Sequence, residues 1–145
     1  MATWQEFCEV APMAEGQELS ATAWVFELPG SSEGRTQKVF AFHEVIQPDF
    51  GILRVTSAIA LITDVDTEKV VQAFGQLLAG AIGYAPTFDD AGQAKDGFLN
   101  VASSLPLGLL DLSDPKGILL YLFIVARAAD DVEQKISSAG YLDLF

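Results

Sequence analysis

Side chains that commonly carry catalysis are scarce in this chain of 145 residues, which has one cysteine, Cys8, and one histidine, His43. With a single cysteine, no internal disulfide can form. A Cys–His catalytic pair would require these two side chains to be adjacent, and nothing in their spacing indicates that they are. Cys8 lies on the apolar face of a predicted helix, where a free thiol usually fills the core. We therefore expect neither residue to support catalysis.

Nucleotide-binding glycine motifs, nucleophile-turn motifs and zinc-ligand sets are also absent. Asp64 and Asp66 precede a predicted helix, where capping and the helix dipole account for them. The turn at residues 89–96 contains carboxylates and a glycine, but it lacks the spacing and the closing glutamate of a calcium loop. The sequence therefore predicts a protein that is not an enzyme and has no cofactor or metal site. An enzyme using Cys8 or clustered carboxylates is the last-ranked alternative.

Basic residues are also scarce. The chain has 8 of them against 20 acidic residues, and no basic residue precedes Arg35. The resulting net charge of −12 repels phosphate backbones and anionic lipid, so nucleic acid and membrane are not expected partners. The longest apolar run, Ile118 to Ala126, is far shorter than the roughly 20 residues that span a bilayer. The first residues lack the basic and apolar regions of a signal peptide. We expect a cytoplasmic location.

Apolar residues, by contrast, are abundant: they make up 50% of the chain, and the mean hydropathy is +0.31. This composition is not typical of a disordered protein. It indicates a compact domain with more apolar surface than one small core needs, and hence an oligomer or a docking surface.

The spacing of apolar residues and turn signals predicts eight elements. Thr3 to Glu6 form a capping box that begins a short helix, and Pro12 ends that helix. The later elements are strands 18–28, 37–46 and 52–62, a helix 67–82 that stops at Gly83, strands 84–88 and 98–105, and a helix from Asp114-Pro115 to about Ser138. Residues 1–145 thus read as one α+β domain. Its antiparallel sheet has five strands and is packed by three helices, in the order α-β-β-β-α-β-β-α.

Two candidate interaction surfaces follow from these elements. The helix 67–82 has no charged residue after Lys69, and solvated helix faces normally carry charge. Its face opposite the apolar stripe is therefore predicted to form a homodimer interface through Gln72, Gly75, Gln76 and Ala79. Aromatic side chains suit interfaces because they bury much area with few rotamers. An apolar partner surface is accordingly predicted from Trp4, Phe7, Trp24 and Phe26.

The final helix is predicted to be the main core element, because Ile118 to Ala126 contains no polar side chain except that of Tyr121. We expect this apolar half to lose nearly all contact with water, against the sheet or against a second subunit. Phe123 is expected to be among the buried residues.

The end of the chain carries a family resemblance. A predicted strand leads into Ser104-Leu-Pro-Leu107 and Leu109-Leu-Asp-Leu112, and the following helix contains Ala128-Ala129-Asp130. Together with the element order and the aromatic N-terminal helix, this pattern resembles the type III secretion chaperone-like fold and its YbjN relatives. The resemblance implies a non-enzymatic protein that is usually homodimeric, and the secretion branch holds partner proteins as extended chains.

The expected function is therefore that of a homodimeric, chaperone-like module that binds a protein partner. A small apolar ligand is the alternative, because a sheet that is apolar on both faces could enclose a pocket. A closed apolar cavity would favour the ligand, and an open groove or a two-fold interface would favour the protein partner.

Overall fold

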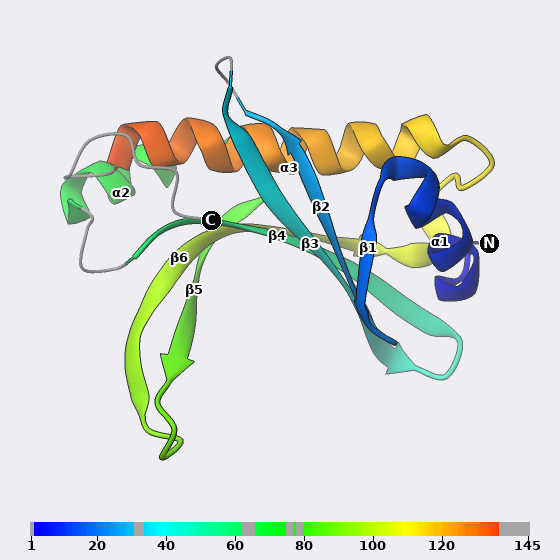
Figure 1. Ribbon diagram of the computed structural model, residues 1–145, viewed down its shortest axis with the longest axis horizontal. Coiled ribbons are helices and arrows are strands. Elements are labelled where there is room, and N and C mark those ends of the chain that lie inside the picture. The colour runs from blue at the N-terminus through cyan, green and yellow to red at the C-terminus, as the bar shows by residue number, and fades with distance from the viewer. Residues whose placement is uncertain (1, 31–33, 62–65, 75–76, 78–79, 137–145) are drawn as a thin grey trace.

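The computed structural model describes residues 2–30, 34–61, 66–74, 77 and 80–136. The described residues form three α-helices, six strands and two short 3₁₀ segments (Figure 1). In chain order these are α1 (Trp4–Val10), η1 (Ala11–Ala14), β1 (Gln17–Ser20), β2 (Ala23–Pro29), β3 (Thr36–Gln47), β4 (Phe50–Leu61), α2 (Thr67–Phe74), β5 (Ala81–Phe88), β6 (Ala94–Pro106), η3 (Leu107–Leu109) and α3 (Pro115–Ile136).

All strands belong to one antiparallel sheet, in the order β1-β2-β3-β4-β6-β5. The first four strands follow one another along the chain, because short turns allow each strand to pair with its predecessor. After α2, the β5–β6 hairpin returns so that β6 pairs with β4 and β5 becomes an edge strand. The predicted α+β class, antiparallel sheet and three helices are confirmed.

The number of strands is corrected from five to six, and the element order gains one strand. The predicted strand 18–28 is a hairpin, in which β1 and β2 are joined at Ala21 and Thr22. Glu18 pairs with Trp24, and the Thr22 amide donates to the Ser20 hydroxyl at 3.3 Å. No glycine or proline marks this turn. The alternation of apolar residues therefore continues across it in the sequence, and one strand was predicted where there are two.

The predicted helix 67–82 is also corrected, because the described α2 ends at Phe74 and both Ala81 and Ile82 belong to β5. Gly80, which directly precedes β5, is not helical. Its φ of +72° is in the left-handed region, and a Cβ there would lie 2.3 Å from the Ala102 carbonyl oxygen of β6. Gly83, predicted to stop the helix, lies inside β5 opposite Asn100.

One face of the sheet is covered by α3, which lies across the strands in Figure 1. Strand alternation turns Val39 of β3 and both Leu53 and Val55 of β4 toward this face, where they are 0–1% exposed. Leu122 and Val125 of α3, both fully buried, belong to the same core. Burial of these apolar side chains is the main force that holds the two layers together.

The predicted helix starts are confirmed at the level of hydrogen bonds. The Thr3 hydroxyl accepts from the Glu6 amide at 3.2 Å, and the Glu6 carboxylate accepts from the Thr3 amide at 2.7 Å. At α3, the Asp114 carboxylate accepts from the Lys116 amide at 3.0 Å. These caps satisfy backbone donors that a helix N-terminus leaves without a partner.

Burial of α3 is less complete than predicted. Three large apolar side chains remain open to water, since Leu120 is 60% exposed, Phe123 37% and Ile124 38%. A helix lying on one sheet presents only part of its circumference to that sheet, so an apolar run of more than one turn cannot be buried by it alone. The outer side of α3 is therefore apolar and, among the described residues, uncovered.

The second half of α3 is fixed by a buried ionic cluster. Asp130 is fully buried, and its carboxylate accepts from Nε and a terminal nitrogen of Arg35, both at 3.2 Å. The Glu133 carboxylate lies 3.6 Å from the same guanidinium. Since Arg35 directly precedes β3, this cluster holds the start of that strand against the helix.

Candidate functional site

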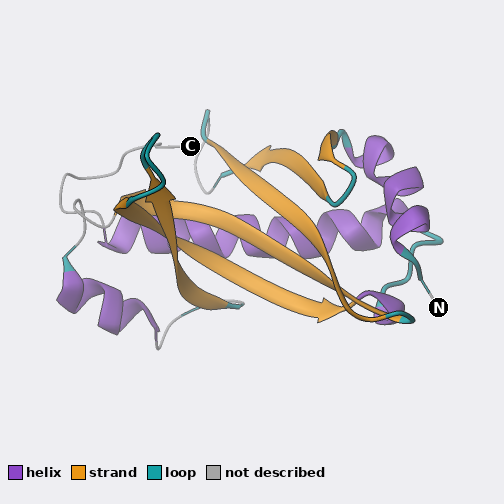
Figure 2. Cartoon of the chain, turned by 90° about the horizontal axis from the view of Figure 1, so that it is seen from below, coloured by secondary structure: helices purple, strands orange, loops and turns teal. Residues whose placement is uncertain are grey.

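The face of the sheet opposite α3 is open and aromatic. Figure 2 views the molecule from this side, and the strands lie in front of α3. Phe40 and Phe42 alternate with the buried Val39 and Ala41 along β3, so their rings project from the open face, where they are half-buried. Their centroids lie 6.3 Å apart with the ring planes 13° from parallel.

These rings line a hollow of about 760 Å³ that is open to solvent. We call its lining the aromatic face: Phe40 and Phe42 of β3, Thr56 and Ala58 of β4, Ala85 of β5, and Phe98 and Asn100 of β6. Side chains from four neighbouring strands thus form one continuous, mainly apolar surface. Glu44 and Arg54 also line the hollow and form an ion pair with an N–O distance of 2.9 Å.

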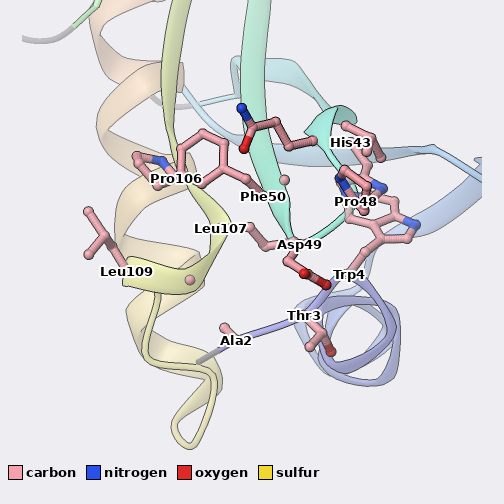
Figure 3. A pocket seen from close by; sticks show the side chains of 14 residues that line it. Ala2, Thr3, Trp4, His43, Pro48, Asp49, Phe50, Pro106, Leu107 and Leu109 are labelled. Atoms are coloured by element: carbon pink, nitrogen blue, oxygen red, sulfur yellow. The ribbon is translucent and has the colours of Figure 1, made fainter.

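A second hollow, here called the end cleft, has a volume of about 600 Å³ (Figure 3). It lies where the start of α1, the β3–β4 turn and η3 come together. Its lining is mostly apolar: Ala2, Thr3, Trp4, His43, Val45, Gln47, Pro48, Asp49, Phe50, Gly51, Pro106, Leu107, Gly108 and Leu109. In Figure 3 the side chains of Trp4 and His43 lie on one side of the cleft and those of Pro106 and Leu109 on the other.

Trp4 and His43 form the aromatic wall of the end cleft. Their ring centroids are 4.9 Å apart with the planes 8° from parallel, and the Trp4 indole donates to the Ala21 carbonyl at 2.8 Å. Gly51 makes room for the histidine, because a Cβ there would lie 2.7 Å from His43 Nε2. Burial lowers the pKa of His43 below its ordinary value. The neutral imidazole is thereby favoured, and the wall acts as an aromatic surface instead of a cationic one.

The residues considered for catalysis or metal binding take part in core packing, ring stacking or capping hydrogen bonds. Cys8 is half-buried and packs against the core cluster, whereas His43 stacks on Trp4. Asp66 accepts from the Glu68 amide at 3.0 Å at the start of α2, and Asp89 accepts from two amides in the β5–β6 turn. Asp64 lies outside the described residues. In the described part of the chain, no group of three or more histidine, cysteine, aspartate or glutamate side chains is arranged to hold a metal ion.

The predicted partner surface of Trp4, Phe7, Trp24 and Phe26 is not an exposed surface. Phe7, Trp24 and Phe26 are only 0%, 6% and 1% exposed, because they lie on the side of the sheet that α1 and α3 cover. Trp4 is half-buried and reaches the end cleft. The phenylalanines that line the aromatic face are instead on β3 and β6.

The predicted dimer face is described only in part. Gln72 is exposed on α2, whereas Gly75, Gln76 and Ala79 lie outside the described residues. The structure thus neither assembles these four residues into one face nor separates them.

Sequence reasoning did not assign Phe40, Phe42 and Phe98 to a shared site. A usable signal was present, because β3 alternates Phe40 and Phe42 with small or branched residues, and this pattern is typical of a strand that is apolar on both faces. Which face α3 would cover could not be read from the pattern.

A scan against protein-family models found no match to this chain, and neither did searches of curated proteins and of solved structures. Among the described helices, none is both long enough and apolar enough to cross a membrane. The functional argument therefore depends on the two hollows and the surfaces around them.

Proposed function

We propose that this protein is a non-enzymatic, protein-binding module of the chaperone-like type, and that the aromatic face receives an extended apolar segment of the partner. The observation that supports this most is the open face itself. It is a mainly apolar surface across four strands, in a chain whose other sheet face is already covered by a helix. Large apolar surfaces left open on a folded domain commonly mark sites of interaction.

The shape of the aromatic face suits a chain more than a compact ligand. Its lining extends over four neighbouring strands and is open to solvent, so an extended peptide can place alternate side chains against Phe40, Phe42 and Phe98. The Glu44–Arg54 pair offers polar partners for a peptide backbone at the side of the apolar surface. The proposed partner on this face is another protein, and the module itself is proposed to be a homodimer.

The test uses reduced, carboxymethylated α-lactalbumin as an unfolded polypeptide, with binding followed by fluorescence anisotropy. Replacing both rings in a Phe40→Thr, Phe42→Thr variant is expected to weaken binding at least tenfold, because the main apolar contact is removed. Val71→Thr on α2 is the matched control, since Val71 is 68% exposed and lies away from the sheet. Melting curves establish that both variants are folded. Equal binding by the double variant and the wild type would contradict the proposal.

A small apolar ligand is the second candidate, and the end cleft is the observation that favours it. Its volume of about 600 Å³ falls within the range of small-molecule sites, and Trp4, Phe50 and Leu107 supply apolar walls. Fluorescent cis-parinaric acid tests this candidate. Saturation at one molecule per chain that Leu109→Arg abolishes, together with no binding of the unfolded polypeptide, would favour the ligand over the protein partner.

A further inference from the structure

The outer side of α3 carries a stripe of three exposed apolar side chains that is flanked by charged side chains of both signs. Leu120, Phe123 and Ile124 are exposed there, with Lys116 on the N-terminal side and Arg127 and Asp131 on the C-terminal side. At 3.6 residues per turn, these six positions fall within an arc of about 100° on the helix. We call them the α3 stripe. In Figure 1 the end of the β2–β3 hairpin crosses α3, and Arg127 donates to the Gly30 carbonyl there at 3.4 Å while its guanidinium lies 5.9 Å from the Phe123 ring centroid.

We infer that the α3 stripe is where two copies of this chain meet, with their α3 helices antiparallel about a two-fold axis between Phe123 and Ile124. That arrangement pairs positions at equal distances on either side of the axis. Phe123 then lies opposite the second copy's Ile124, and Leu120 lies opposite the aliphatic stem of its Arg127. The inference rests on the proposed homodimer, but it uses a surface separate from the aromatic face.

Charge supports the same register. Lys116 and Asp131 are equally far from the proposed axis, so each lysine lies opposite the second copy's aspartate. With a rise of 1.5 Å per residue, both of these ion pairs lie about 11 Å from the axis. Asp131 is within 2.8 Å of Lys135 on its own helix and is about 40% exposed, so it remains accessible to the second copy.

The wider charge distribution also favours a second copy at this place. The chain has a net charge of −12, so two copies repel each other over most of their surfaces. Lys116, Arg127 and Lys135 are three of its eight basic residues, and all three lie on or beside the α3 stripe. These basic side chains offset part of the repulsion between two copies at this contact, and the exposed apolar side chains are removed from water in the same contact.

The contact is expected to be weak, because one helix face is small relative to the about 800 Å² per partner of a standard stable interface. We expect a dissociation constant in the micromolar range. Sedimentation equilibrium of the full chain, from low micromolar to about 1 mM, measures it directly. Phe123→Arg should weaken self-association at least tenfold, whereas Val71→Arg, at an exposed apolar position on α2, should leave it unchanged.

Charge reversal then tests the register. Lys116→Glu places two carboxylates opposite each other in each pair, and Asp131→Lys places two lysines opposite each other, so each variant alone should be mainly monomeric. When the two variants are mixed, both pairs become attractive, and native mass spectrometry should show heterodimers. A structural defect in either variant would not produce this rescue.

Three outcomes would overturn the inference. A wild-type chain that stays monomeric up to about 1 mM would exclude a second copy at the α3 stripe and leave the stripe to a different partner. A dimer that Phe123→Arg does not weaken would place the contact elsewhere, for example on α2. A Phe123-dependent dimer with no charge rescue would contradict the antiparallel register. Binding of the unfolded polypeptide to the aromatic face is measured separately, so failure here and failure of the proposed function remain distinguishable.

Discussion

Arg35 is a single residue that joins two parts of the fold far apart in the sequence. Its guanidinium contacts Asp130 at 3.2 Å and Glu133 at 3.6 Å, and both carboxylates are almost completely buried. Removing one partner of a buried ion pair is costly, because the other charge stays buried without compensation.

We therefore expect Arg35→Met to lower the free energy of unfolding by about 3–5 kcal/mol, as is typical when a buried pair loses one partner. Urea denaturation followed by circular dichroism measures this change. Arg54→Met is the matched control, because the Arg54–Glu44 pair is exposed and such pairs contribute about 0–1 kcal/mol. A loss at position 35 no larger than at position 54 would show that the buried cluster does not stabilise α3.

His43 gives a second prediction at the same scale. Because burial lowers its pKa in the folded protein, the unfolded chain binds a proton at a higher pH than the folded one does. The resulting stabilisation is complete above the unfolded pKa of about 6.5 and is lost as the pH falls through the lower, folded pKa. His43→Phe keeps a ring against Trp4 but does not titrate.

Unfolding by urea at pH 7.5 and at pH 5.0 is therefore expected to show a larger drop in stability for the wild type than for His43→Phe. Other groups titrate in both proteins, so only the difference between them reports on His43. Identical drops would mean that the environment of His43 does not disfavour its protonated form.

At the scale of elements, the single helix α3 carries both apolar side chains that are buried in the core and apolar side chains that are exposed to water. Leu122 is 0% exposed in the core, whereas its neighbour Phe123 is 37% exposed. Leu122→Ala is expected to cost about 2–5 kcal/mol of stability, as for other buried leucines.

Phe123→Ala should cost clearly less at protein concentrations of a few micromolar, where few chains are associated. Thermal melts of the two variants under the same conditions give the comparison. Equal losses would mean that the outer side of α3 is covered by part of the chain or by a second copy under those conditions.

Some of the helices and strands could be predicted from the sequence, and others could not. Strand β3, strand β4 and helix α3 were placed to within a few residues, because strong alternation, turn residues and the Asp114 cap mark them. The β1–β2 hairpin was missed because Ala21 and Thr22 carry no turn signal. The end of α2 was misplaced because residues 77–82 have apolar spacing that suits either a helix or a strand.

The candidate site was less predictable than the fold, for a related reason. Alternation identifies which residues share a face of a strand, but not which face the helices will cover. Trp24 and Phe26 therefore appeared as suitable for a surface as Phe40 and Phe42. Burial of the first pair in the core shared with α1 and α3 decided between them, and α3 lies about a hundred positions further along the chain.

At the scale of the whole molecule, the net charge of −12 is the dominant electrostatic feature. Like charges on a folded domain repel one another and destabilise its compact state. Salt screens this repulsion, with a Debye length of about 10 Å at 0.1 M and about 3 Å at 1 M.

Raising sodium chloride from 0.02 to 0.3 M is therefore expected to raise the melting temperature by several degrees. Scanning calorimetry measures this shift, and a Glu9→Gln, Glu15→Gln variant should show a smaller one, because both replaced carboxylates are exposed. A melting temperature that falls with salt would indicate that attractive ion pairs outweigh the general repulsion.

The position of α3 after all six strands has a consequence for the order in which the fold forms. All six strands precede residues 115–136 in the chain, so any part of the sheet that forms before α3 is available has both of its apolar faces open. Val55, which faces α3 in the folded protein, is then as open to water as Phe42, which lies on the face that α3 does not cover. Open apolar faces and strand edges promote aggregation of folding intermediates. Packing of α3 onto the sheet covers one of these two faces and thereby lowers the tendency of the chain to aggregate.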